Sequence, residues 1–179
     1  CARTFQALPS DQAMDTSITP PTGNAADDRE VVAGLLGRSP KGQFEVVVRD
    51  GAGVPVVIRN HPLLEDGRPM PTRFWLVGND LRSRIGTLES TGGVRAAEAD
   101  CDPAVLADAH ARYAEERDAA IPEGYVGHRP SGGVGGTRKG VKCLHAHYAW
   151  FLAGGDDPVG RWVHAHLNEG PAPEDGSGG

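Results

Sequence analysis

Three residues that can do chemistry lie two positions apart in the segment KCLHAH: Cys143, His145 and His147. A thiol beside an imidazole supplies a nucleophile and a base, whereas a thiolate and two neutral imidazoles supply ligands for a metal ion such as zinc. Three cations precede this group: Arg138, Lys139 and Lys142. The segment therefore predicts a catalytic site, a metal site or an anion site.

The local conformation determines which of these side chains face one another. In a helix, Cys143 and His147 share a face four residues apart, so His147 can act as base for Cys143, while His145 points to nearly the opposite side. In a strand, all three side chains face one way and can hold one metal ion. Apolar residues downstream recur at helical spacing and favour a helix over residues 141–153. Cys143 in the first turn of that helix, paired with His147, is therefore the catalytic hypothesis.

The metal interpretation stays open with a wider set of ligands. The candidates are Cys143, His145, His147 and His166, with His110 and Cys101 as more distant ones. Structural zinc sites usually contain paired C-x-x-C elements and four ligands, and this chain has no C-x-x-C. A structural interpretation competes, with Cys143 as a small buried residue and His147 and His166 as hydrogen-bonded core histidines. The identity of any cofactor is left open.

A glycine-rich loop, GGVGGTRKG at residues 132–140, leads into this segment. Glycine lets backbone N–H groups approach a phosphate or carboxylate, and an arginine can bind two oxygens at once. Cations are the wrong sign for a helix N-terminus, and either a bound anion or acidic side chains from elsewhere in the fold would remove this conflict. The expected anion-binding residues are Gly135, Gly136, Arg138, Lys139 and Lys142. The loop fits neither GxxxxGK[ST] nor GxGxxG, so a solvated basic loop without a ligand is the competing interpretation.

Two acidic features outside this segment also have a chemical interpretation. Glu89, near the end of an expected helix, is a candidate general base or a partner for Arg138, although solvated glutamates are common at helix ends. Asp156 and Asp157 precede Pro158 and are interpreted more simply as a helix cap than as a metal-binding pair.

Composition excludes several classes of function. The 179 residues carry 18 basic and 24 acidic side chains, a net charge of −6, so no nucleic-acid surface is expected and any anion site has to be local. No apolar run approaches the roughly 18 to 20 residues of a membrane span. Three scattered cysteines are too few for a disulfide framework and favour a cytoplasmic location. Because the chain begins with Cys1 and shows no hydrophobic signal segment, we expect a clipped or partial reading frame there rather than a mature lipoprotein.

The elements that must position these residues follow an α+β pattern. We expect disordered segments at 1–28 and 170–179 and a single domain at 29–169. A short helix should precede a hairpin turning at residues 50–53 and a third strand in TRFWLVG. Further helices are expected around Leu81 to Leu88, after the cap Asp102, over 141–153 and after Asp157. The prediction is a small antiparallel sheet of about three strands covered by four to five helices.

Five segments, in this order, resemble the bacterial domain of unknown function 501 family: GRSPKGQFEVVVR, PMPTRFWLV, LESTGGV, GVGGTRKGVKCLHAHYAWFLAGG and DPVGRWV. The resemblance covers about residues 35–165 and implies a single cytoplasmic domain of undetermined activity. It also implies a gene near a septum-formation initiator and an exopolyphosphatase, hence a link to the envelope or to phosphate metabolism. Some relatives carry cysteines where this chain has Asp50 and Gly78, so a site that needs those thiols cannot exist here in the same form. The matching candidate positions are Arg138, Lys142, Cys143, His145 and His147.

Two functional hypotheses follow. The first is a protein that binds a phosphorylated or carboxylated small molecule, and that is an enzyme if Cys143 and His147 react with it. The alternative is a non-enzymatic binding or scaffold protein linked to cell division or envelope upkeep, whose Cys/His segment is structural or holds a metal. A cleft over residues 133–147 would favour the first, and a buried Cys143 under a flat surface would favour the second. Protein partners and oligomeric state are not predicted.

Overall fold

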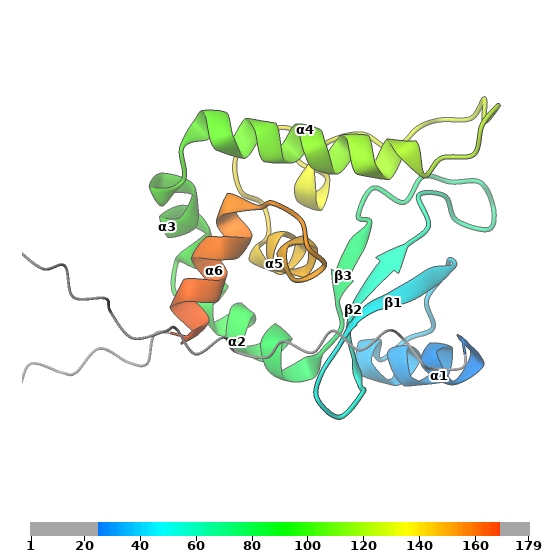
Figure 1. Ribbon diagram of the computed structural model, residues 1–179, viewed down its shortest axis with the longest axis horizontal. Helices are drawn as coiled ribbons and strands as arrows, with labels where there is room; N and C mark the ends of the chain where they lie inside the picture. Colours follow the sequence, from blue (N-terminus) through cyan, green and yellow to red (C-terminus); the bar gives the residue numbers. More distant parts are fainter. Residues whose placement is uncertain (1–24, 169–179) are drawn as a thin grey trace, which may run out of the picture.

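The computed structural model describes residues 25–168, so the predictions for residues 1–24 and 169–179 lie outside the described residues. This part of the chain forms six α-helices and one three-stranded sheet (Figure 1), which confirms the expected α+β class. The first helix, α1 (Ala25–Leu36), begins earlier than the expected domain start at residue 29. None of the described helices combines the length and the apolar character needed to cross a membrane.

The sheet is antiparallel, with the strands in sequence order: β1 (Phe44–Arg49), β2 (Pro55–Asn60) and β3 (Phe74–Leu76). The hairpin turn lies where the sequence predicts it. Asp50 Oδ1 accepts the N–H groups of Ala52 and Val54, each at 2.9 Å. Gly53 adopts a φ of 81°, which glycine reaches without a steric penalty. These contacts fix the turn and therefore the pairing of β1 with β2.

Successive residues of β2 point to opposite faces of the sheet, and both faces are covered. Ile58 packs with Val32 of α1 in a small cluster, whereas Val57 belongs to the main core. Figure 1 shows α1 beside β1 and β2, and α5 (Leu144–Leu152) beside β3. The helix that carries His145 and His147 therefore lies against β3.

The helices α2 (Asn79–Ser90), α3 (Gly93–Asp100) and α4 (Pro103–Ala119) follow the sheet. The predicted N-cap of α4 is confirmed, since Asp102 Oδ1 accepts the Ala104 N–H at 2.7 Å. The helix α3 was not expected, because the sequence predicts no helix between Leu88 and Asp102. Gly92 instead takes a left-handed φ of 95°, which both ends α2 and begins α3.

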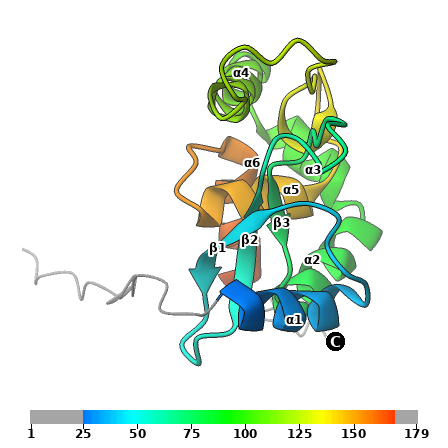
Figure 2. The same cartoon turned by 90° about the vertical axis from the view of Figure 1, so that its right-hand side faces the viewer.

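The helix α5 (Leu144–Leu152) occupies the middle of the domain, below α4 and beside β3 (Figures 1 and 2). Residues 146–150 are all buried, as expected for a helix surrounded by other elements. The predicted start of this helix at residue 141 is wrong. Cys143 is the N-cap, with an extended φ of −157°, and residues 137–143 are not helical. The physical reason is that Glu89 of α2 accepts the Leu144 N–H at 2.6 Å, so a distant side chain caps the helix at a later residue than the local repeat indicates.

The last helix, α6 (Pro158–Asn168), confirms the interpretation of Asp157 as a cap, because its Oδ1 accepts the Gly160 N–H at 2.9 Å. A Cβ at Gly160 would overlap Phe151, so α5 and α6 pack closely at that glycine. The placement of His166 on the buried stripe of this helix is wrong. His166 is exposed and its ring stacks on Trp162 with centroids 3.6 Å apart.

Candidate functional site

Two carboxylates accept the backbone N–H groups at the start of α5. Glu98 of α3 accepts the Val141 N–H at 2.9 Å, and Glu89 of α2 accepts the Leu144 N–H at 2.6 Å. Carboxylates in this position satisfy unpaired N–H groups and complement the helix dipole. The sequence left two possible partners for the cationic helix start, a bound anion or acidic side chains. The structure places acidic side chains of α2 and α3 there. Glu89 thus has a backbone partner here, rather than the predicted Arg138.

The glycine-rich loop is held in place by two buried side chains of α4. His110 Nδ1 accepts the Val134 N–H at 3.1 Å, and Arg117 donates to the Gly132 carbonyl at 2.6 Å. A Cβ at Gly133 would overlap the His110 ring, so this approach of loop and helix requires glycine. The loop is therefore packed against α4 and is not a solvated basic loop along its whole length.

The donors of the predicted phosphate cradle are partly used within the loop itself. The Gly136 N–H donates to the Gly133 carbonyl at 3.0 Å, and the Gly133 N–H donates to the Thr137 carbonyl at 2.6 Å. Gly135 adopts a φ of 66° inside this tight turn. The geometry does not bring Gly135 and Gly136 to the pocket described next, where an anion could lie beside Arg138 and Lys139.

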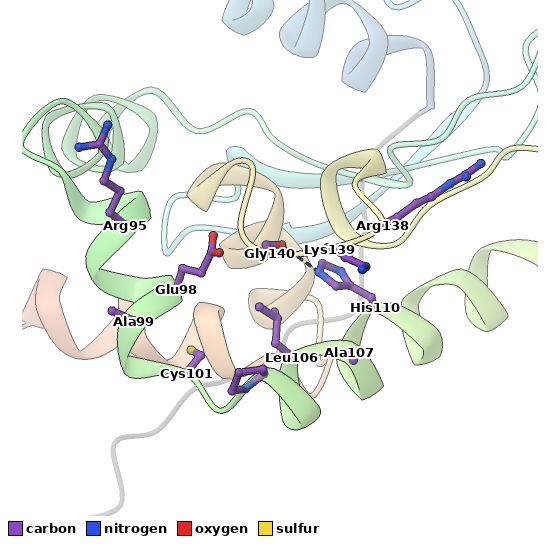
Figure 3. Close-up of a pocket in the computed structure, with 11 residues that line it drawn as sticks. Arg95, Glu98, Ala99, Cys101, Leu106, Ala107, His110, Arg138, Lys139 and Gly140 are labelled. Atoms are coloured by element: carbon purple, nitrogen blue, oxygen red, sulfur yellow. Dashed lines mark hydrogen bonds between the residues drawn. The ribbon is translucent and has the colours of Figure 1, made fainter.

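A pocket of about 670 Å³ opens between α3, α4 and the end of the loop, and we call it the α4 pocket (Figure 3). Three of its lining residues are cations: Arg95, Arg138 and Lys139. Its other lining residues are mainly apolar or small: Ala99, Cys101, Pro103, Leu106, Ala107 and Gly140, with Glu98 and His110. In Figure 3, Arg95 and Arg138 extend at opposite ends of the group, with Glu98 and His110 between them. The α4 pocket combines an apolar lining with positive charge at its edge.

His110 in the α4 pocket is held as a neutral imidazole by its two backbone partners. Nδ1 accepts the Val134 N–H, and Nε2 donates to the Gly140 carbonyl at 3.0 Å. Burial lowers the pKa of His110, although the hydrogen bond to Gly140 opposes this shift. Cys101 in the same pocket is only 9% exposed, and burial together with the charge of Asp157 raises the pKa of its thiol. Neither group is poised for chemistry at neutral pH.

A second group of reactive side chains lies on the other side of the start of α5. Glu89, Cys143 and His145 each offer one ligand atom, and these atoms lie within 4.8 Å of one another; we call this group the Cys143 cluster. His145 Nδ1 lies 3.3 Å from Glu89 Oε1, and Nε2 lies 3.1 Å from the Arg82 carbonyl. Cys143 and His145 also line a pocket of about 400 Å³ beside β3, the β3 pocket.

Both ring nitrogens of His145 face acceptors, so the doubly protonated ring is favoured. A hydrogen-bond interaction with the Cys143 side chain has the largest effect, and the Arg82 carbonyl and the charge of Glu89 add to it. Together they raise the pKa of His145 to about 9, against burial, which lowers it. In the Cys143 cluster a carboxylate, a thiol and an imidazole thus converge on a position that favours a cation.

His147 does not lie in the Cys143 cluster. Its side chain is fully buried, and Nδ1 lies 2.7 Å from Asp157 Oδ2, which is also fully buried. Nε2 is buried and has no hydrogen-bond partner among the described residues, and the ring lies 5.7 Å from that of His110. The orientation expected for His145, away from Cys143, is therefore wrong, and it is His145 rather than His147 that accompanies the thiol. The error follows from the late helix start, because Cys143 is extended and its side chain does not follow the helical repeat.

The remaining predicted residues are dispersed. Lys142 is exposed and lines neither pocket, and His166 lies on the outside of α6. Arg95 and Glu98 were not among the predicted site residues, because their helix α3 was not expected. Glu89 was a candidate because it is a carboxylate near a helix end. Its hydrogen-bond partner, the Leu144 N–H, lies 55 residues away in sequence, so no local pattern reveals it.

Comparison with known proteins gives a family but no activity. A family model with the description "Protein of unknown function (DUF501)" matches residues 46–165. No curated protein and no solved structure matches the chain. Both pockets lie largely inside the matched span, which contains all of the Cys143 cluster and every residue that lines the α4 pocket.

Proposed function

The chain belongs to the DUF501 family, and we propose that it binds a small organic anion in the α4 pocket. The observation that carries this proposal is the position of Arg95, Arg138 and Lys139 around one concave, largely apolar surface. All three are exposed, and none forms an ion pair with a residue in the described range 25–168. Their charge is therefore available to a ligand.

The lining of the pocket supports a particular class of ligand. A volume of about 670 Å³ falls in the range typical of small-molecule sites. Leu106, Pro103 and Ala99 offer apolar contact, while Arg138 can bind two oxygens of a phosphate or carboxylate at once. The carboxylate of Glu98 lies in the same pocket and disfavours an anion of high charge. These features favour an anion with an apolar body, such as a phosphate monoester or an aryl carboxylate.

The scaffold alternative receives less support from this geometry. It expects a buried Cys143 under a flat surface, but Cys143 is only partly buried and lines the β3 pocket. Cys143 does not line the α4 pocket, so as the proposed nucleophile, with His145 in place of His147 as its neighbour, it would act on a substrate in the β3 pocket. Anion binding in the α4 pocket does not depend on that catalytic role.

Thermal unfolding with added anions tests the proposal. Phenyl phosphate, a nucleotide and a dicarboxylate are compared with inorganic phosphate and pyrophosphate, and the apolar lining predicts that phenyl phosphate acts at lower concentration than phosphate. A ligand at about 100 times its Kd raises the free energy of unfolding by about 2.7 kcal/mol. The double variant Arg138→Ala, Lys139→Ala should lose this response.

Lys142→Ala is the matched control, because Lys142 is an exposed cation of the same segment that does not line the α4 pocket. It should respond to anions as the wild type does. The proposal is wrong if no anion changes the unfolding midpoint, or if the double variant responds as strongly as Lys142→Ala.

A further inference from the structure

We infer that the Cys143 cluster binds a divalent transition-metal ion, with zinc the best match, through Glu89, Cys143 and His145. Their ligand atoms already lie within 4.8 Å of one another, although the residues come from α2 and from the start of α5. A sulfur, a nitrogen and an oxygen ligand together suit zinc, whereas magnesium and calcium prefer oxygen alone. This inference is independent of the proposed function, since none of the three residues lines the α4 pocket.

The orientation of His145 is the one that metal-binding histidines use. Such a histidine commonly donates one ring N–H to a backbone carbonyl or carboxylate, which fixes the tautomer and directs the other nitrogen at the metal. Here Nε2 lies 3.1 Å from the Arg82 carbonyl, and Nδ1 faces the Glu89 carboxylate at 3.3 Å. Arg82 therefore orients the ring from outside the cluster and leaves Nδ1 to bind the ion.

Glu89 and Cys143 are also held without using up their ability to bind a metal. The Leu144 N–H donates to Glu89 Oε1 at 2.6 Å, which anchors the carboxylate while its remaining lone pairs stay available. Cys143 occupies the N-cap position of α5 but makes no side-chain capping hydrogen bond. An N-cap side chain usually accepts a helix N–H, and here Glu89 takes over that role. The thiol is thereby free to act as a ligand.

The β3 pocket gives the cluster access to solvent and room for a further ligand. Cys143 and His145 line it together with Arg38, Arg82 and Trp75. Three protein ligands with one open position are typical of catalytic rather than structural zinc sites. Arg38 lies over the Trp75 ring at 5.4 Å, and Arg82 donates to the Leu35 carbonyl at 2.9 Å. The open position therefore faces a pocket with two fixed guanidinium groups, which suits water or an anionic group as the fourth ligand.

Metal analysis of the full chain, purified without an affinity tag, tests this inference. The protein is stripped with a chelator, reconstituted with zinc and analysed for metal, and is separately titrated with cobalt(II), whose thiolate complex absorbs in the near ultraviolet. Wild type should bind about one equivalent. Cys143→Ser should lose the cobalt–thiolate absorption, and Glu89→Gln and His145→Gln should weaken zinc binding at least about tenfold.

The chain supplies a matched control for each variant: Glu98→Gln, Cys101→Ser and His110→Gln. These residues are of the same types but line the α4 pocket, and they should leave metal binding at the wild-type level. Circular dichroism checks that each variant is folded. If a variant does not fold, metal binding by the wild type still tests the inference. Less than about one-tenth equivalent of zinc after reconstitution, with no cobalt–thiolate absorption, overturns the inference. It is equally overturned if Cys101→Ser rather than Cys143→Ser abolishes the absorption.

Discussion

The α4 pocket and the Cys143 cluster contain the same three residue types on two sides of the start of α5. Each has a glutamate that accepts a backbone N–H of residues 141–144, Glu98 in one and Glu89 in the other. Each also has one cysteine and one histidine. Their chemistry nevertheless differs, so residue types alone do not define either site.

The difference comes from the hydrogen-bond partners of the two histidines. His110 meets one donor, the Val134 N–H, and one acceptor, the Gly140 carbonyl, and is satisfied as a neutral ring. His145 meets acceptors on both sides, so it favours a proton or a metal ion. The two thiols differ in their exposure, because Cys101 is buried in the core and Cys143 is partly open to the β3 pocket. The α4 pocket is thus suited to binding, and the Cys143 cluster to chemistry.

Gly133→Ala should give the largest change in stability, because it breaks the contact that holds the loop on His110. The new Cβ would overlap the imidazole, and overpacking of this kind costs about 1–3 kcal/mol. Gly86→Ala in α2 is the control, since a Cβ there meets nothing within 4 Å. That change should raise the free energy of unfolding by about 0.5–1 kcal/mol. Urea unfolding of both variants measures the difference, and equal effects would contradict the tight packing of loop and helix.

The two thiols should differ in reactivity by at least about tenfold, since alkylation needs an accessible thiolate. In a Cys1→Ser background with a chelator present, iodoacetamide should modify Cys143 before Cys101, whose burial raises the pKa of its thiol. Peptide mass spectrometry gives both rates in one sample. Faster alkylation of Cys101, or no reaction of Cys143 without denaturant, would remove the chemical distinction between the two regions and the proposed nucleophile with it.

The pH dependence of stability should show that His110 is neutral in the folded state. Its pKa is lowered by folding, so the unfolded chain binds a proton more readily and the free energy of unfolding falls as the pH drops below about 6.5. The slope from this group is at most about 1.4 kcal/mol per pH unit. The charges that face His110 are His147, which lowers the pKa further, and Asp157, which raises it. Lys139, Arg138 and Glu98 line the same pocket.

Unfolding of wild type and His110→Gln between about pH 7.5 and pH 5.5, one unit either side of the reference pKa of histidine, measures this contribution. The variant should be less stable at neutral pH but should lose less stability on acidification. The same loss in both proteins would show that His110 is protonated freely in the folded state.

The sequence predicted the elements that are fixed by local interactions. Asp102 and Pro103 begin α4, and the turn at residues 50–53 joins β1 to β2, because their capping and turn contacts span only a few residues. Arg138 and Lys139 were also recognised as candidate anion-binding residues, and both line the α4 pocket. Local patterns were sufficient for these positions.

Contacts between distant residues account for what the sequence did not predict. Carboxylates 43 and 55 residues earlier accept the N–H groups before and at the start of α5, so the helical repeat was extended too far and Cys143 was paired with His147. His166 fits the apolar repeat of α6, but its ring lies against Trp162 on the outer surface. His147 is a hydrogen-bonded core histidine, as the structural interpretation expected, but its partner Asp157 was identified from the sequence only as a cap.

The α4 pocket, and not the Cys143 cluster, is the proposed binding site of the organic anion. A ¹⁵N–¹H NMR titration of the metal-free protein with phenyl phosphate tests it most directly, because it reports on both regions at once. We expect saturable shifts of the backbone amides at residues 138–140 and 95–99, with the amides of Leu144 and His145 unchanged. Saturable shifts confined to residues 143–145 and to Arg38 and Arg82, or no saturable shift at all, would contradict it.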